Sequence, residues 1–397
     1  MFSPLADRTY RHLFAAQVLS LLGTGLMTVA LGLLAFELAG AGAGAVLGTV
    51  LAIKMIAYVV IAPVAGAFVH LVPRRALLVG LDLVRAVVAL ALPWVTELWQ
   101  AYLLVGLLQS CSAAFTPSFQ ATIPTVLPDE ADYTKALSLA RLAYDLESLS
   151  SPMLAAALLA VMGFHWLFAG TVLGFLASAL LVLSVVLPAA APPADAEGAW
   201  HRITRGTRLY LATPRLRGLL ALNLAVAASG AMVIVNSVVL VRAALGLDEG
   251  ALAWTLACYG FGSMTAALAL PRVLRRLDER RVMLAGAVVL AAGLLAGPMV
   301  LHDWRLVMAL WVLLGLGNGL VLTPAGLLLR RSGTAGELPA LFAAQFALSH
   351  ACWLLTYPLA GWLGSRQGLP GAFLVLGALA VAGTLAALRL WPARHGA

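Results

Sequence analysis

The stretch Arg141-Leu-Ala-Tyr-Asp145-Leu-Glu147-Ser-Leu-Ser-Ser-Pro152 places three charges inside a segment that otherwise reads as a membrane-spanning helix. An ionisable side chain near the centre of a bilayer costs about 2.5–3.5 kcal/mol on insertion scales, so these charges must be paired or hydrated. Arg141 and Asp145 stand four residues apart and can neutralise each other on one helical face. Glu147 lies about 200° around the helix from Asp145. Glu147 therefore needs a partner from another helix, whereas Arg141 and Asp145 fit a structural ion pair as well as a functional one.

The composition of the chain excludes an ordinary soluble protein. Of the 397 residues, 62% are hydrophobic and only 11% are charged, which is typical of a polytopic membrane protein. The net charge of +8 comes from basic residues scattered through short loops, so we expect no nucleic-acid partner. Cys111, Cys258 and Cys352 fall in the middle of apolar runs, and no disulfide framework is expected.

Twelve apolar runs are long enough to cross the hydrocarbon core. They cover residues 10–38, 44–69, 75–96, 99–127, 134–162, 165–188, 218–244, 250–272, 282–301, 305–329, 338–364 and 369–391. Residues 200–211 fit a short basic amphipathic helix on the membrane surface. We therefore expect an all-α protein with an N-terminal six-helix bundle (1–188), a cytoplasmic linker (189–216) and a C-terminal six-helix bundle (217–397).

The distribution of basic residues predicts the orientation in the membrane. With both termini in the cytoplasm, 19 of the 25 Lys and Arg residues face inward, and only Arg305 and Arg366 face outward. This asymmetry follows the positive-inside rule. We expect a monomer integral to the plasma membrane, the inner membrane of a bacterium, with membrane lipid around it.

Prolines recur at a nearly constant offset between the two halves of the chain. Pro117 and Pro324 are 207 residues apart, Pro152 and Pro358 are 206 apart, and three further pairs differ by 204 to 208. A repeat of six spans is the architecture expected of a secondary transporter whose halves rock against each other.

Polar residues line one face of several predicted spans. In the first half these are Gln17, Ser20 and Thr24, followed by Gln109, Ser112, Thr116 and Gln120. In the second half they are Asn223, Asn236, Asn318, Gln345 and His350. Such residues either join helices through hydrogen bonds or line a wet substrate pathway, and both interpretations stay open. For His350 the alternative to a site residue is a ring buried among Phe346, Trp353 and Tyr357.

The deep charges of the first half balance, and their pairing leaves one carboxylate for function. The cations are Lys54, Arg85 and Arg141, and the anions are Asp82, Asp145 and Glu147. Asp82 and Arg85 are three residues apart and can pair within one helix, as Arg141 and Asp145 can. Elimination leaves Lys54 and Glu147, at similar depth on different helices. Our hypothesis is that Glu147 couples transport to protons, being paired with Lys54 or a cationic substrate in one state and protonated in the other.

The chain resembles the major facilitator superfamily along its whole length. The run from Gly66 through His70 to Arg74 and Arg75 looks like that superfamily's cytoplasmic gating loop, although His70 stands where the motif has an acid. Residues 114–130 resemble the macrolide-efflux branch, and residues 8–17, 51–58 and 136–147 resemble nickel-resistance exporters of the NreB type. The nickel exporters are associated with a histidine-rich C-terminal tail, which this chain lacks.

The resemblance implies proton-coupled efflux by alternating access, with the first, fourth, seventh and tenth spans lining the cavity. The expected substrate is a divalent metal cation such as nickel, and the alternative is an amphipathic macrolide-like drug or a siderophore. A facilitative uniporter or channel and a non-transporting sensor of the same fold are the competing classes. No phosphate-binding loop or zinc-ligand spacing is present, so we expect neither an enzyme nor a cofactor, and the residues of any metal site are unknown.

Overall fold

The predicted apolar runs become long helices in the computed structural model, which describes residues 2–39, 43–188 and 198–391. The first half consists of α1 (Arg8–Ala39), α2 (Ala43–Phe68), α3 (Arg74–Ala91), α4 (Leu98–Val126), α5 (Glu130–Leu159) and α6 (His165–Leu183). After α7 (Ala199–Ala212), the second half consists of α8 (Pro214–Val238), α9 (Glu249–Val273), α10 (Glu279–Ala296), α11 (Trp304–Leu322), α12 (Ala325–Arg330), α13 (Leu338–Arg366) and α14 (Gly368–Leu390).

The all-helical membrane fold predicted from the sequence is confirmed. Eleven stretches of the described chain are long and apolar enough to cross a membrane. The remaining predicted span, the fifth along the chain, is α5. It is not among these eleven stretches, although its 30 residues would extend about 45 Å.

Two helix boundaries differ from the predicted apolar runs. The tenth span is divided into α11 and α12 at Pro324, because proline cannot donate the backbone hydrogen bond that would continue the helix. The helix of the seventh run begins earlier than residue 218, since α8 starts at Pro214, a residue suited to the first helical position. The amphipathic helix expected at 200–211 is present as α7, while residues 189–197 of the linker lie outside the described residues.

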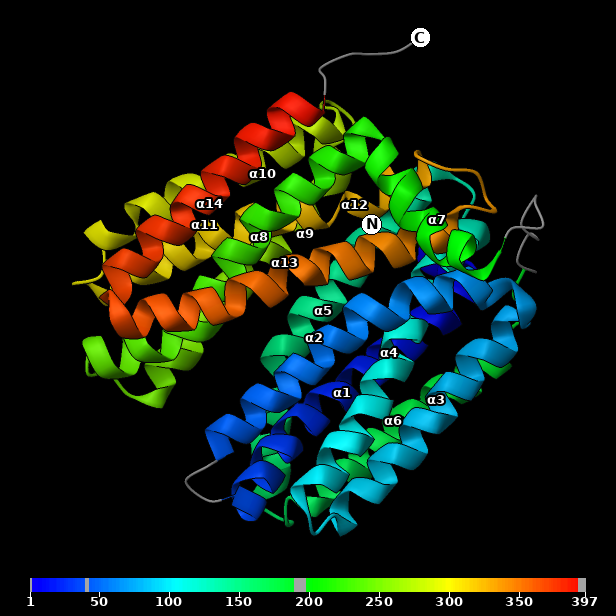
Figure 1. The fold of residues 1–397 in the computed structure, drawn as a ribbon, viewed down its shortest axis with the longest axis horizontal. Helices are drawn as coiled ribbons and strands as arrows, with labels where there is room; N and C mark the ends of the chain where they lie inside the picture. The colour runs from blue at the N-terminus through cyan, green and yellow to red at the C-terminus, as the bar shows by residue number, and fades with distance from the viewer. Residues whose placement is uncertain (1, 40–42, 189–197, 392–397) are drawn as a thin grey trace.

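The helices form two bundles that meet along two seams. In the first bundle α1 packs on α5 and α6, and α2 packs on α4, while in the second α9 packs on α11 and α8 on α14. Figure 1 shows α2 and α13 side by side between the bundles, and α5 against α9 forms the second seam. Within the second bundle, a Cβ on Gly315 would lie 1.9 Å from the carbonyl oxygen of Tyr259. Such close helix packing requires glycine.

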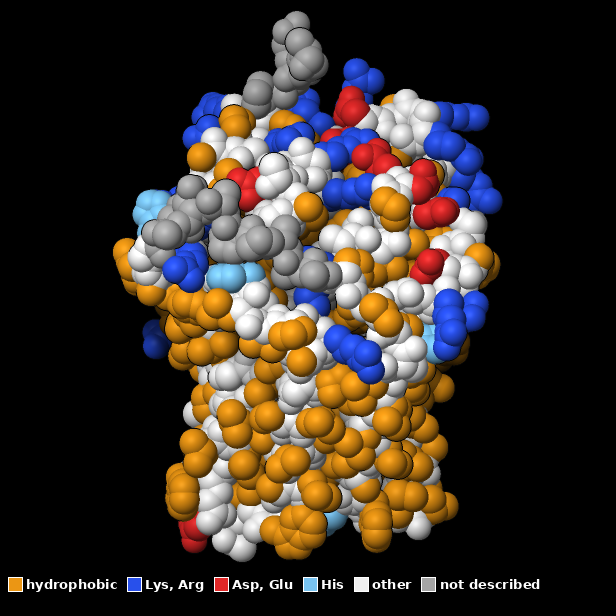
Figure 2. Space-filling view, turned by 90° about the vertical axis from the view of Figure 1, so that its right-hand side faces the viewer, with side chains coloured by type: hydrophobic (Ala, Val, Ile, Leu, Met, Phe, Trp, Pro, Cys, Tyr) orange, Lys and Arg blue, Asp and Glu red, His pale blue; other side chains and the backbone are white. Residues whose placement is uncertain are grey.

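The charged side chains gather at one end of the molecule, as Figure 2 shows. We call this the basic end: it is the end at which α1, α3, α5, α8, α10 and α13 begin. The lower part of the same view is covered mainly by hydrophobic side chains, as expected of a surface that faces lipid.

An ion-pair network joins the two bundles at the basic end. Arg331, which follows α12, pairs with Glu130 at the start of α5 and, at 2.7 Å, with Glu279 at the start of α10. The hydrogen bonds from Arg331 lower the pKa of the Glu130 carboxyl below its usual range. Arg330 donates to the carbonyl of Pro128 and lies 5.1 Å above the Tyr133 ring. We call Arg331, Glu130 and Glu279 the basic-end latch.

The α2–α13 seam is held by close packing and by aromatic contacts. A Cβ on Gly66 would lie 2.6 Å from the Ala343 side chain, so glycine permits the approach of the two helices. Further from the basic end, the Tyr58 ring packs on Phe346 and His350 with centroids 4.8 and 4.7 Å apart.

Helix α7 contacts both helices of the α2–α13 seam. Arg202 lies 6.0 Å from the Phe68 ring of α2, whereas Tyr210 donates a 2.5 Å hydrogen bond to Gln345 of α13. Arg205 lies 3.8 Å from Glu337, which precedes α13. The interbundle contacts described here therefore lie in the half of the molecule that contains the basic end.

Replacing Arg331 with alanine should loosen the basic end. Exposed ion pairs contribute about 0.2–1 kcal/mol each, so losing the Arg331–Glu130 pair, which crosses between the bundles, should raise the open population by up to about fivefold. The measurement is the rate of maleimide labelling of Ala136→Cys, a buried position beside Leu327, in a background with the native cysteines replaced by serine. Arg281→Ala is the control, because Arg281 pairs with Asp278 beside it in the same bundle. Equal labelling rates in both variants would show that the latch does not hold this end closed.

Candidate functional site

The Asp82–Arg85 pair is sealed inside the first bundle. The two residues of α3 form the ion pair that their spacing predicts, and both are almost completely buried. The Ser178 hydroxyl of α6 donates to Asp82 at 2.7 Å. The Arg85 guanidinium lies between the Phe115 and Phe175 rings, 4.1 and 4.5 Å from their centroids. The ion pair within α3 and the aromatic packing thus explain how these two charges are stabilised inside the bundle.

The Arg141–Asp145 pair lies on the α5–α9 seam. A nitrogen of Arg141 is 2.8 Å from an Asp145 oxygen, and Arg141 Nε donates to the Ser263 hydroxyl of α9 at 2.9 Å. This pair therefore also contributes a polar contact between the bundles, which the sequence alone did not indicate.

Glu147 differs from the other two intramembrane acids. Its carboxylate accepts a 3.4 Å hydrogen bond from the Ser151 hydroxyl and lies against α1 at Gly25. Lys54 is within electrostatic range of Glu147 and lies 5.6 Å from the Tyr58 ring. Among the described residues the two form no ion pair, because the Glu147 side chain is directed towards α1 and Ser151. Both side chains are only half-buried.

Lys54 and Glu147 lie just beyond the interbundle contacts. The contact residues Tyr58 of α2 and Arg141 of α5 are about 15 and 17 Å from the basic ends of their helices at 1.5 Å per residue. Lys54, 14 residues before Phe68, is about 21 Å from that end, and Glu147 about 26 Å. Both positions thus lie beyond these contacts, in the direction in which the ribbons of α2 and α13 diverge in Figure 1.

Two of the seven polar residues predicted in the first half, Gln17 and Gln109, join helices. Gln17 of α1 shares a hydrogen bond with Tyr144 of α5, and Gln109 accepts one from Tyr58 at 3.2 Å. Thr24 bonds back to the carbonyl of the buried Ser20 at 2.9 Å. The other three, all on α4, are half-buried: Ser112, Thr116 and Gln120.

The polar residues of the second half are dispersed. Asn236 donates to the Ala360 carbonyl at 3.2 Å and joins α8 to α13, and Asn318 is buried in α11. The amide nitrogen of buried Asn223 has no hydrogen-bond partner in the described part of the chain. Gln345 is engaged by Tyr210 of α7. The structure therefore does not bring these residues together into one cluster.

His350 is a packed ring in the α2–α13 seam. Its Nδ1 is 2.7 Å from the Phe346 carbonyl oxygen, and its ring contacts Phe346 and Tyr58. Helical spacing predicted correctly that Phe346 lies beside His350. It could not predict the contact with Tyr58, because Tyr58 belongs to the other bundle.

Residues of the predicted gating loop contact both their own bundle and the opposite one. Arg74 is buried and donates to the Thr125 hydroxyl at 2.9 Å, which joins α3 to α4 within one bundle. Arg75 is exposed, and His70 is half-buried in the short turn Val69–Leu71. Within this segment, Gly66 contacts the opposite bundle at Ala343.

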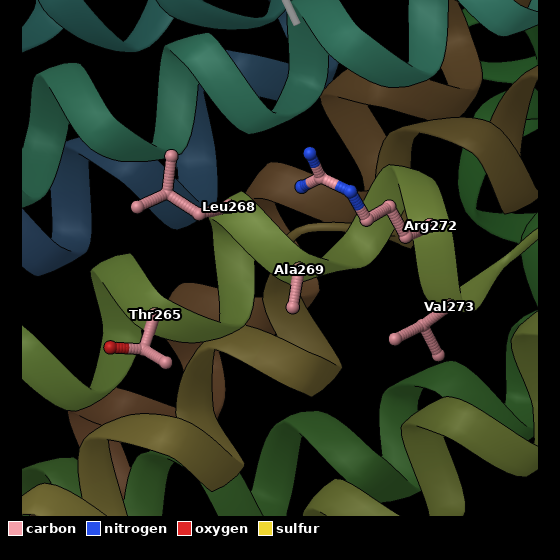
Figure 3. Close-up of a pocket in the computed structure, with 5 residues that line it drawn as sticks. All are labelled: Thr265, Leu268, Ala269, Arg272 and Val273. Carbon is pink, nitrogen blue, oxygen red and sulfur yellow. The ribbon is translucent and has the colours of Figure 1, made fainter.

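No metal site is preformed in the described part of the chain. Those residues contain no group of three or more His, Cys, Asp or Glu side chains able to hold an ion. A surface hollow is lined by residues of α9 alone, Thr265, Leu268, Ala269, Arg272 and Val273 (Figure 3). None of these is a predicted site residue, and the candidate site remains the region of Lys54 and Glu147.

Replacing Asp82 with asparagine should destabilise the first bundle strongly. The substitution leaves the buried Arg85 without its counter-ion, which costs about 3–5 kcal/mol. Unfolding of the purified protein by added SDS measures the change. Asp132→Asn is the control, because Asp132 pairs with Lys135 where both side chains are partly exposed. The free energy of unfolding should fall by less than about 1 kcal/mol in this variant. Equal stabilities of the two variants would contradict a structural role for the α3 pair.

Solved structures of several transporters share this fold. The human organic anion transporter MFSD10 (TETRAN) aligns with a TM-score of 0.77 at 13% identity, over 96% of this chain and 99% of that one. A bacterial homologue of the iron transporter ferroportin, in an outward-facing state, gives 0.79 at 14% identity, over 96% and 99%. The E. coli fucose:proton symporter FucP gives 0.73 at 15% identity, over 96% and 98%. At these identities the likeness shows the fold alone.

Sequence comparison places the chain in a family. It is 25% identical over 336 residues to the uncharacterized MFS-type transporter YfiS of Bacillus subtilis (strain 168), covering 81% of this chain and 79% of that protein. Residues 1–327 match the family described as transmembrane secretion effector. The chain therefore belongs to this family of major facilitator superfamily transporters.

Proposed function

We propose that the protein is a secondary active exporter that exchanges protons for its substrate at Glu147. The observation that carries the proposal is the pairing of the acids: Asp82 and Asp145 each have an arginine partner in their own helix, whereas the half-buried Glu147 has none among the described residues. An intramembrane carboxylate without a fixed counter-ion is suited to bind a proton and a cation alternately.

Orientation gives this exchange a direction. By the positive-inside rule the basic end faces the cytoplasm, so a structure with interbundle contacts at that end represents an outward-facing state. Glu147 then receives a proton from outside. After the bundles rock, the proton is released to the cytoplasm, and the free carboxylate pairs with Lys54 or with a cationic group of the substrate. Because proton and cation compete for one carboxylate, they cross in opposite directions.

The site favours an organic cation over nickel as the substrate. Divalent nickel needs several imidazole, thiolate or oxygen ligands, and the described residues hold no such group. The ammonium of Lys54 also repels a doubly charged metal ion near Glu147 about twice as strongly as a singly charged organic cation at the same distance. The Tyr58, Phe346 and His350 rings border this region and suit the apolar body of an amphipathic amine. The family description, a secretion effector, supports outward transport.

The variant Glu147→Gln should abolish proton-driven export. Glutamine has the shape of the protonated acid but cannot release a proton, so substrate exchange should persist while the response to the pH gradient disappears. The measurement is substrate-induced dissipation of the pH gradient in everted membrane vesicles. Asp132→Asn, on the same helix but outside the apolar region, should behave as the parent. Proton-driven export with the parent's pH dependence in Glu147→Gln would remove this residue from the mechanism.

Growth of an expressing strain should distinguish the substrate classes. In a host lacking its own drug exporters, we expect a several-fold increase in the tolerated concentration of erythromycin, an amphipathic amine, and no protection against Ni²⁺ or Co²⁺. The gain should be lost with Glu147→Gln. Protection against Ni²⁺ that requires Glu147 would instead support the nickel hypothesis.

A further inference from the structure

Gly25 leaves a notch in α1 that polar atoms of α5 occupy. A Cβ built on Gly25 would lie 2.0 Å from the Ser151 hydroxyl oxygen, 2.3 Å from Ser151 Cβ and 2.6 Å from Glu147 Oε1. Real Cβ atoms do not approach neighbours this closely. The space that a side chain would take at position 25 is thus filled by the carboxyl of Glu147 and its hydrogen-bond donor.

The other glycines of α1 show that this contact is not general helix packing. At Gly23 the nearest atom to an added Cβ is the carbonyl oxygen of Thr171 in α6, at 3.1 Å, whereas at Gly32 nothing lies within 4 Å. Of these three positions, only Gly25 faces an ionisable side chain.

The charged groups around Glu147 define where its carboxyl can go. Lys54 approaches from α2, Tyr144 lies on α5 itself, and His350 of α13 faces Lys54. Towards the basic end, Arg141 and Asp145 neutralise each other and face Tyr259 of α9. Lys54 is therefore the cation available to Glu147 when its carboxyl leaves the notch.

We propose that Gly25 and Ser151 form a seat that holds the Glu147 carboxyl at the α1–α5 contact, apart from Lys54, and that Gly25 is a positioning residue for this group. The inference rests on the proposed role of Glu147. In the seat, the carboxyl is partly buried and has no ion pair, an environment that suits its neutral, protonated form. Release from the seat towards Lys54 accompanies loss of the proton.

The substitution Gly25→Ala fills the notch with a methyl group and displaces the carboxyl towards Lys54. A carboxylate held near an ammonium binds its proton less tightly, typically by one pH unit or more. The midpoint of Glu147 titration should therefore move to lower pH by about one unit. Lys54→Met added to Gly25→Ala removes the ammonium and should move the midpoint back up.

Infrared titration of the purified protein in lipid nanodiscs tests this without a known substrate. The carbonyl stretch of the protonated acid is identified by its disappearance in Glu147→Gln, and its midpoint is then compared among the parent, Gly25→Ala and the control Gly32→Ala. Gly32→Ala should titrate as the parent, because its methyl group meets no neighbour. A purely structural effect of Gly25→Ala would lower yield or stability without moving the midpoint.

Two failures of this experiment are distinguishable. If no band is lost in Glu147→Gln across the accessible pH range, Glu147 does not exchange protons and the proposed function fails. If the band exists but Gly25→Ala titrates as the parent, the seat is wrong while the proposed function stands. Should Gly25→Ala not fold, Ser151→Ala replaces it: because the Ser151 hydroxyl donates to the carboxylate, removing it should move the midpoint to higher pH by a smaller amount, and an unchanged midpoint overturns the proposal.

Discussion

The free energy of placing a charge in a low-dielectric membrane is the constraint on which the first bundle depends. Arg85 satisfies it with Asp82, which also accepts a hydrogen bond from the Ser178 hydroxyl, and with two aromatic faces. Arg141 satisfies it with Asp145 and shares the pair with Ser263 on the opposite bundle. Both arginines are neutralised by an acid one helical turn away, so their charge balance does not depend on how the bundles are arranged. Lys54 and Glu147 have no such local partner, and their environment changes when the bundles move.

Contacts within and between the bundles differ in kind. Inside the second bundle, Gly315 brings α11 against the backbone of α9, a dry contact that dispersion forces and close packing stabilise. Between the bundles, α2 and α13 also approach closely at Gly66, but the latch adds only the partly exposed Arg331–Glu130 ion pair, and such pairs are individually weak. Bodies with tight interiors and a weakly held boundary can rotate against each other as units. The division of contacts is the one that alternating access requires.

The sign of the substrate's charge decides the direction of coupling at a carboxylate that faces an ammonium. In the proposed mechanism, a cation that binds Glu147 displaces its proton, so the two move in opposite directions and an inward proton gradient drives export. An anion that binds Lys54 would instead release Glu147 from its partner and favour protonation, which would carry both inward together. The match to a family of secretion effectors is consistent with the first arrangement and therefore with a cationic substrate.

The sequence by itself determined the helical membrane class, the number of long helices and the local ion pairs, because hydropathy and residue spacing act within one helix. Asp82 with Arg85 and Arg141 with Asp145 follow from separations of three and four residues. The contacts of Tyr58 with His350, of Ser263 with Arg141 and of Gly25 with Glu147 join residues that lie 122 to 292 positions apart in the sequence. No periodicity encodes such contacts, since they depend on how whole helices rotate and pack. Only the tertiary structure therefore decided that Glu147 lies against α1, away from the lysine that charge balance had assigned to it.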